Sequence, residues 1–154
     1  MTQRLSYERV APQAYRAMRG LEDYVKSTGL ERPLLELIKL RASYINGCAS
    51  CVDMHTKDAR VAGETEQRLF AVPVWRETPF FTPRERAALA WTEAVSNVAR
   101  GNVSDDVYRE ARKQFGEVEL VELTMAVIAI NGWNRLAVAF QSEVGSYRPE
   151  RTAD

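Results

Sequence analysis

Two helices and the turn between them are predicted by the stretch LLELIKLRASYINGCASCVDMH, residues 34–55, which decides the fold. Leu34, Ile38 and Ala42 repeat at four-residue spacing, so they form one apolar face of a helix that ends near Ile45. An Asn-Gly pair follows, and both residue types accept the positive φ that ends a helix. A second helix starts directly after this pair.

Helical spacing continues on both sides of this stretch, and no run alternates apolar and polar residues as a strand would. Pro33 suits the first turn of its helix, and Thr82 with Glu85 forms a capping-box pattern. Asn131 and Gly132 interrupt the last apolar pattern. The predicted helices cover residues 8–28, 33–45, 48–62, 64–70, 83–99, 105–115 and 117–140, with an ordered aromatic loop at 71–81 and a frayed tail at 146–154. The predicted fold class is all-α.

The composition suits a single globular domain of 154 residues and excludes several function classes. Lys plus Arg number 21 and Asp plus Glu number 21, so no basic excess favours nucleic-acid binding. The longest apolar run, residues 125–130, is too short to cross a bilayer, and the N-terminus lacks an apolar signal core. We therefore expect a cytoplasmic protein with no membrane and no nucleic-acid partner.

The chemistry-bearing residues of the chain gather at the start of the second helix. Cys48, Cys51 and His55 are its only two cysteines and its only histidine. On a helix they stand at i, i+3 and i+7 and so share one face. A helix N-terminus stabilises a thiolate, and His55 can donate or accept a proton within a turn of Cys51. Cytoplasm keeps ordinary thiols reduced, so the pair is interpreted as a redox centre rather than a structural staple.

Two other interpretations of these residues stay open. A zinc site would need a fourth ligand besides the two thiols and His55, and Asp53, Glu36 or a water would have to supply it. Alternatively, the cysteines are two small buried hydrophobes of a non-enzymatic helical module. The ligand count favours redox chemistry over zinc, and the spacing from Cys51 to His55 favours it over an incidental pair.

At these residues the sequence resembles the AhpD-like alkylhydroperoxidases of the carboxymuconolactone decarboxylase superfamily. Glu36, the Cys48-x-x-Cys51 pair and His55 match that family's motif, and residues 37–56 are similar to its core throughout. The stretches VWRE and TPRERAALAW later in the chain are similar as well. The resemblance covers residues 14–140 and implies that the whole chain is one AhpD-like helical bundle that assembles into a homo-oligomer, commonly a trimer or hexamer.

The resemblance also implies a reaction and a role for each residue. Cys51 would be the peroxidatic thiolate that attacks a hydroperoxide, and Cys48 the resolving thiol that condenses with the sulfenic acid. Glu36 and His55 would form a proton relay, with Glu36 semi-buried and its pKa raised. A dithiol donor, such as a lipoyl-bearing protein or a thioredoxin-like protein, would restore the thiols. No cofactor and no metal is expected.

One position departs from the family pattern. The best-characterised members carry a histidine immediately before the second cysteine, and here that residue is Ser50. A hydroxyl passes a hydrogen bond but has no useful basicity near neutral pH. A general dithiol–disulfide oxidoreductase or a redox sensor with weak peroxidase activity is therefore the alternative function.

Overall fold

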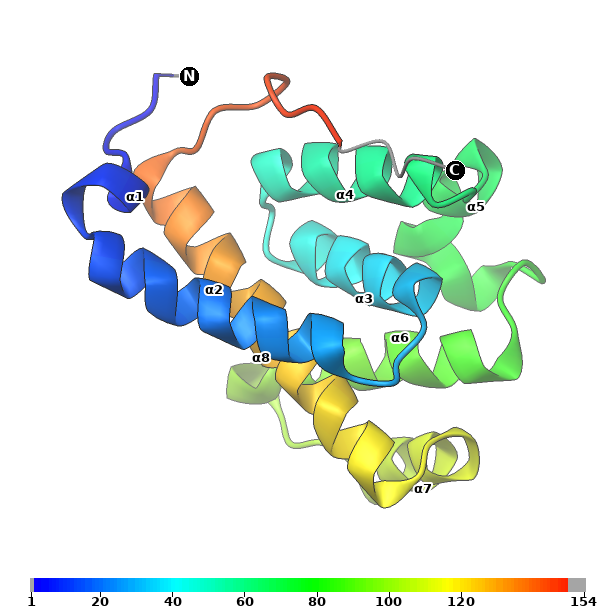
Figure 1. Cartoon of the computed structure of the whole chain (residues 1–154). Coiled ribbons are helices and arrows are strands. Elements are labelled where there is room, and N and C mark those ends of the chain that lie inside the picture. Colours follow the sequence, from blue (N-terminus) through cyan, green and yellow to red (C-terminus); the bar gives the residue numbers. More distant parts are fainter. Residues whose placement is uncertain (1, 150–154) are drawn as a thin grey trace.

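The computed structural model describes residues 2–149, and every regular element in these residues is a helix, as predicted (Figure 1). Ten helices follow one another along the described chain. They are α1 Tyr7–Val10, α2 Pro12–Ser27, α3 Arg32–Ile45, α4 Ala49–Val61, α5 Glu66–Ala71, the 3₁₀ helix η1 Val72–Glu77, α6 Pro83–Ser96, the 3₁₀ helix η2 Val98–Arg100, α7 Asp105–Gln114 and α8 Glu117–Phe140.

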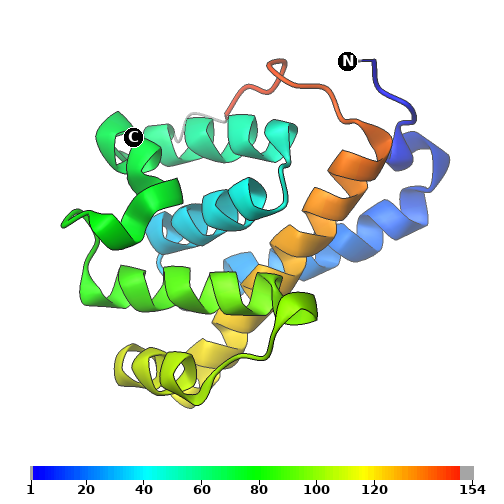
Figure 2. The same ribbon diagram turned by 180° about the vertical axis from the view of Figure 1, so that it is seen from behind.

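Helix α3 lies in the middle of the molecule and packs against α4, α6 and α8 (Figures 1 and 2). Its two sides face two clusters of buried apolar side chains. The first joins α3 to α2, α6, α7 and α8 and includes Val25, Leu34, Ile38, Ala88, Phe115, Leu123 and Val127. The second joins it to α4, α5, η1 and α6 and includes Leu37, Leu40, Ala59, Leu69, Val72, Trp75 and Leu89. Burial of a large aliphatic side chain stabilises a fold by roughly 1.5–3 kcal/mol, so these clusters fix the position of α3.

The first predicted helix is two helices in the structure. Helix α1 ends at Val10, and α2 begins at Pro12, which occupies the N-terminal turn of its helix. A proline lacks the backbone N–H that would continue the preceding helix, and it also restricts the residue before it. The single helix predicted over residues 8–28 is therefore wrong at Pro12.

Helix α8 is continuous from Glu117 to Phe140, as predicted, although Asn131 and Gly132 interrupt its apolar pattern. The Asn131 side chain donates to the carbonyl of Val127 one turn earlier, at 2.9 Å. Gly132 faces α2 closely, since a Cβ built on it would lie 2.8 Å from Cε of Met18. The glycine thus serves the contact between α2 and α8 rather than ending a helix.

The region predicted to be an aromatic loop contains the short helix η1. Trp75 and Phe81 are buried in it, whereas Phe80 is partly exposed. The indole of Trp75 donates to Glu93 Oε1 at 2.7 Å. These aromatics pack on the body of the molecule, and Thr82 and Glu85 form the predicted capping box of α6.

The tail is ordered over its described part, contrary to the expectation of fraying. Residues 142–149, here called the C-terminal strap, run from the end of α8 back to α4 (Figure 1). Gly145 N–H donates to Asp53 at 3.1 Å, and Lys57 donates to the Tyr147 carbonyl at 3.1 Å. The rest of the predicted frayed tail, residues 150–154, lies outside the described residues.

Helix α8 is also long and apolar enough, by length and composition, to cross a membrane. In this fold it packs against α2, α3, α4, α6 and α7. Its buried residues Leu123, Val127 and Ile130 belong to the interior. The core helix of a globular protein passes the same test of length and composition.

Candidate active site

The redox pair is positioned by the turn between α3 and α4, as predicted. Asn46 follows the last residue of α3, and Gly47 adopts a φ of 63°, a conformation that glycine tolerates without strain. Cys48 is the N-cap residue of α4, and its N–H donates to the Ser43 carbonyl at 2.9 Å. The chain therefore reverses between α3 and α4 and places Cys48 and Cys51 in the first turn of α4.

A network of partly and fully buried amide side chains ties this turn to α8. The Asn46 side chain donates to Oδ1 of Asn131 and to Oδ1 of Asn134, both at 3.0 Å. Asn134 is fully buried and donates in turn to the Ser43 hydroxyl at 3.1 Å. Buried amides are costly unless they are hydrogen-bonded, so this network fixes the turn against the core.

Cys48 and Cys51 are joined by a disulfide, and their Cα atoms lie 5.4 Å apart. Cys48 is 1% exposed and Cys51 4% exposed, so both sulfurs lie inside the protein surface. Near them, the Ser50 hydroxyl is 3.7 Å from the Cys48 sulfur. The residue that replaces the usual histidine therefore contacts the first cysteine of the pair.

His55 and Glu36 meet across the α3–α4 interface. Nδ1 of His55 lies 2.8 Å from Oε2 of Glu36, and both residues are buried. Burial by itself raises the pKa of Glu36, but the hydrogen bond and charge of His55, with the charges of Lys39 and Arg32, outweigh it and lower the pKa. The pairing with the imidazole is as expected. The expectation of a raised pKa is wrong, because the carboxylate has a buried partner and two nearby cations.

The hydrogen bond to Glu36 determines which nitrogen of His55 is free to react. An ionised carboxylate only accepts hydrogen bonds, so the imidazole donates from Nδ1–H. The other nitrogen, Nε2, is buried and has no hydrogen-bond partner among the described residues. Cys51 is one turn before His55 on the same face of α4. The free nitrogen is thus available to exchange a proton with a reacting group near the disulfide.

Asp58 joins this group, and sequence reasoning missed it. One ligand atom each from Glu36, His55 and Asp58 lie within 4.8 Å of one another. Asp58 follows Cys51 and His55 at i+7 and i+3 on α4, a spacing that already places it on their face. The Tyr147 hydroxyl of the C-terminal strap donates to Asp58 Oδ1 at 2.7 Å. No sequence signal links Tyr147 to Asp58, because they are distant along the chain.

These three side chains are also the set that could hold a cation. Three of their ligand atoms already make hydrogen bonds, since His55 Nδ1 bonds to Glu36 Oε2 and Asp58 Oδ1 accepts from Tyr147. The two sulfurs offer no thiolate to zinc while they are bonded to each other. Asp53, the other proposed fourth ligand, bonds to Lys57 and to the Gly145 N–H. The donor set therefore fits a hydrogen-bonded relay better than a zinc site.

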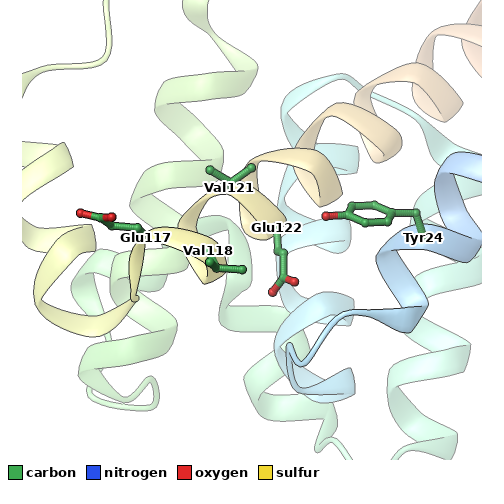
Figure 3. Close-up of a pocket in the computed structure, with 5 residues that line it drawn as sticks. All are labelled: Tyr24, Glu117, Val118, Val121 and Glu122. Carbon is green, nitrogen blue, oxygen red and sulfur yellow. The ribbon is translucent and has the colours of Figure 1, made fainter.

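A shallow hollow lies away from these residues, between α2 and the start of α8 (Figure 3). Figure 3 shows Tyr24 of α2 facing Glu122 of α8, with Val118 and Val121 on the same helix. None of its lining residues belongs to the redox pair or to the aromatic segment before α6.

Comparisons with known proteins agree with this geometry. The Carboxymuconolactone decarboxylase family profile matches residues 12–94, which include the redox pair, Glu36 and His55. The chain belongs to this family. The chain is similar to the Bacillus subtilis protein YdfG, with 40% identity over 146 residues, covering 95% of this chain and 99% of YdfG. The Escherichia coli protein YnjA is 30% identical over 117 residues, covering 76% of this chain and 62% of YnjA.

Solved structures place this family member among AhpD-like folds. ATU0492 from Agrobacterium tumefaciens, a protein of unknown function suggested to be the antioxidant defence protein AhpD, superposes with a TM-score of 0.92. It is 46% identical, and the match covers 95% of this chain and 100% of that one. An AhpD-core peroxidase-related protein from Ralstonia eutropha JMP134 superposes with a TM-score of 0.79 at 21% identity, covering 90% of this chain and 74% of that one, which shows the shared fold.

Proposed function

We propose that this protein is a thiol-dependent peroxidase that reduces hydroperoxides through the Cys48–Cys51 pair. The observation that carries the proposal is the buried Cys48–Cys51 disulfide at the start of α4, one turn before a histidine. Its Nδ1 bonds to Glu36, and its Nε2 has no hydrogen-bond partner among the described residues. This arrangement supports an activated nucleophile, because helical spacing brings His55 onto the face of Cys51 and Glu36 orients the imidazole.

The proposed cycle gives each of the four residues a defined role. The Cys51 thiolate attacks one oxygen of the hydroperoxide, the O–O bond breaks, and His55 gives a proton to the leaving alkoxide, which departs as the alcohol. Cys51 is then a sulfenic acid. The Cys48 sulfur attacks the Cys51 sulfur, water leaves, and the disulfide forms. Glu36 holds the imidazole and stabilises its protonated form before the proton is donated.

A dithiol donor completes the cycle. One donor thiolate attacks the disulfide and forms a mixed disulfide, and the second donor thiol displaces it, so that both cysteines return as thiols and the donor becomes a disulfide. A lipoyl-bearing or thioredoxin-like protein supplies this chemistry. A cycle that needs such a donor fits the reducing cytoplasm, where we place the protein.

The experiment that tests this function follows thiols and peroxide together. Wild-type protein is expected to lose both free thiols when alkyl hydroperoxide is added, with one disulfide formed for each peroxide consumed. Cys51→Ser is expected to lose peroxide reduction, while Cys48→Ser is expected to accumulate a sulfenic acid that dimedone traps. Full peroxidase activity in Cys51→Ser would overturn the assignment.

A second function is favoured by Ser50, which contacts the Cys48 sulfur where a histidine is usual. Without that base, the pair would act mainly as a general dithiol–disulfide oxidoreductase or redox sensor. The two functions are separated by comparing the rate of peroxide reduction with the rate of exchange with lipoyl, thioredoxin and glutathione donors. Fast exchange with negligible peroxide reduction identifies the second function.

We further propose that the protein is a homo-oligomer, in keeping with the trimers or hexamers that the family resemblance implies. Support comes from an apolar face on α8, where Val118, Val121 and Ile128 are 71%, 61% and 47% exposed. These side chains recur at spacings of three and seven, so they form one stripe along the helix. Large exposed apolar patches mark contact surfaces more often than free surface.

A further inference from the structure

Asp58 lies beside the Glu36–His55 pair and takes no part in the steps above. One carboxylate oxygen of Asp58 lies within 4.8 Å of a carboxylate oxygen of Glu36 and of a ring nitrogen of His55. Glu36 comes from α3, whereas Asp58 is one helical turn after His55 on α4. The imidazole is therefore close to two acidic groups that come from different helices.

The C-terminal strap holds Asp58 in place. The Tyr147 phenol donates to Asp58 Oδ1 at 2.7 Å, and Lys57 donates to the Tyr147 carbonyl. Gly145 of the strap is fixed separately, by its N–H bond to Asp53. A segment far away in sequence thus supplies a hydrogen-bond donor to a carboxylate next to the redox centre.

We propose that Asp58 is a positioning residue for the redox centre, and that Tyr147 keeps its carboxylate ionised so that His55 is a stronger base toward Cys51. The inference rests on the proposed function only in taking Cys51 as the reactive thiol. An ionised Asp58 attracts the protonated imidazole and so favours transfer of the thiol proton to His55.

Distance decides which effect of the Asp58 charge dominates. A carboxylate near Cys51 would repel the thiolate and work against its formation. Cys51 is seven residues before Asp58, which is about 10 Å along a helix axis, whereas the His55 ligand atom is within 4.8 Å. Coulomb interactions fall with distance, so stabilisation of the imidazolium outweighs repulsion of the thiolate.

The surroundings of Asp58 make its ionisation sensitive to the phenol. Burial raises the pKa of Asp58, the hydrogen bond from Tyr147 opposes that rise, and the charge of Glu36 adds to it. The charges of His55 and Arg32 also oppose the rise. The net pKa is raised, so protonation of this carboxyl occurs at a higher pH than for an ordinary aspartate. Loss of the phenol donor raises that pH further.

The test measures alkylation of Cys51 by iodoacetamide in the reduced full chain carrying Cys48→Ser, between about pH 4 and pH 9. Asp58→Asn is expected to slow alkylation at neutral pH by about threefold to tenfold. It is also expected to remove the fall in alkylation rate at acidic pH that follows protonation of Asp58. Tyr147→Phe keeps the ring and is expected to move that fall to higher pH by about half a unit to one unit.

Two control variants separate this effect from loosening of the strap. Asp53→Asn weakens the attachment of the strap, because it removes the charge that accepts from the Gly145 N–H and from Lys57, and it leaves the His55 surroundings intact. Tyr108→Phe makes the same hydroxyl deletion on α7. Both are expected to keep the parent profile. An unchanged profile in Asp58→Asn, or an equal shift in Asp53→Asn and Tyr147→Phe, overturns the inference. Alkylation needs no peroxide, so a protein without peroxidase activity would still give this readout.

Discussion

Glu36 determines which ring nitrogen of His55 carries the proton. Its carboxylate accepts from Nδ1, and the charges of Lys39 and Arg32 help to lower its pKa. Lys39 is itself buried and pairs with Glu22 of α2. The Glu36–His55 pair is therefore supported by the buried residues Lys39 of α3 and Glu22 of α2, and by Arg32 at the exposed start of α3.

The lowered pKa of Glu36 leads to a prediction about stability and pH. A carboxyl whose pKa is lower in the folded state stabilises the fold above its unfolded pKa, and this contribution is lost as the pH falls through the folded value. Glu36→Gln is expected to lower the free energy of unfolding by about 1–3 kcal/mol at pH 7. Urea unfolding at neutral and acidic pH measures the difference, which should shrink in acid.

Glu77→Gln is the matched control for this variant, because Glu77 is exposed on η1. It is expected to leave the free energy of unfolding unchanged at both pH values. A loss of stability in Glu36→Gln that is as large in acid as at neutral pH would contradict the ionised pairing with His55.

Ser50 gives a second prediction about a single residue. Ser50→His is expected to increase the rate of peroxide reduction by about tenfold or more, because an imidazole next to Cys51 adds a base that a hydroxyl cannot replace. Stopped-flow peroxide consumption by the reduced protein measures the rate. Ser50→Asn, which is polar but not basic, is the control, and an equal gain in that variant would exclude proton transfer as the cause.

Helix α8 shows how a glycine can serve packing between two elements. The position of Gly132 against Met18 leaves no room for a side chain unless the Met18 terminus moves. Gly132→Val is expected to lower the free energy of unfolding by about 1–3 kcal/mol through overpacking. The additional loss caused by this substitution should be smaller in a Met18→Ala background, because the methionine tip is then absent. Thermal unfolding of the double-mutant cycle measures the coupling, and strictly additive losses would contradict the contact.

The boundaries of helices were predictable from sequence where a local signal sets them. Thr82 and Glu85 cap α6, and Asn46-Gly47 ends α3, because capping and positive φ depend on residues next to one another. The roles of Asn131 and Gly132 were not predictable, because they depend on partners in other helices. Pro12 did carry a local signal, and the periodic apolar residues around it masked that signal.

The candidate site was likewise predictable where local spacing determines it, and not where tertiary contacts do. Cys48, Cys51 and His55 share one helix, so their spacing places them together. Glu36 was identified through the family resemblance, and the structure places it on the imidazole. Asp58 was readable from the same spacing, whereas Tyr147 was not, because the path of the strap across α4 depends on tertiary contacts rather than on local sequence.

At the scale of the whole molecule, the apolar stripe on α8 gives a prediction about assembly. Val121→Asp is expected to convert the wild-type oligomer into a smaller species, because burial of a carboxylate at a contact is unfavourable. Light scattering coupled to size-exclusion chromatography measures the mass. Val98→Asp, at an exposed position on η2, is the control that should leave the mass unchanged. A monomeric wild-type protein would contradict the proposed homo-oligomer.

The closeness of the two cysteines has a consequence for the lifetime of the proposed peroxidase in strong oxidant. In the proposed cycle, Cys48 is within one helical turn of the Cys51 sulfenic acid, because the two Cα atoms lie 5.4 Å apart. Disulfide formation therefore proceeds at a high effective concentration of the Cys48 thiol. A second oxidant molecule must instead diffuse to a sulfur that is only 4% exposed. Irreversible conversion to sulfinic acid should therefore be rare, and mass spectrometry after repeated turnover should find the dithiol fully recoverable.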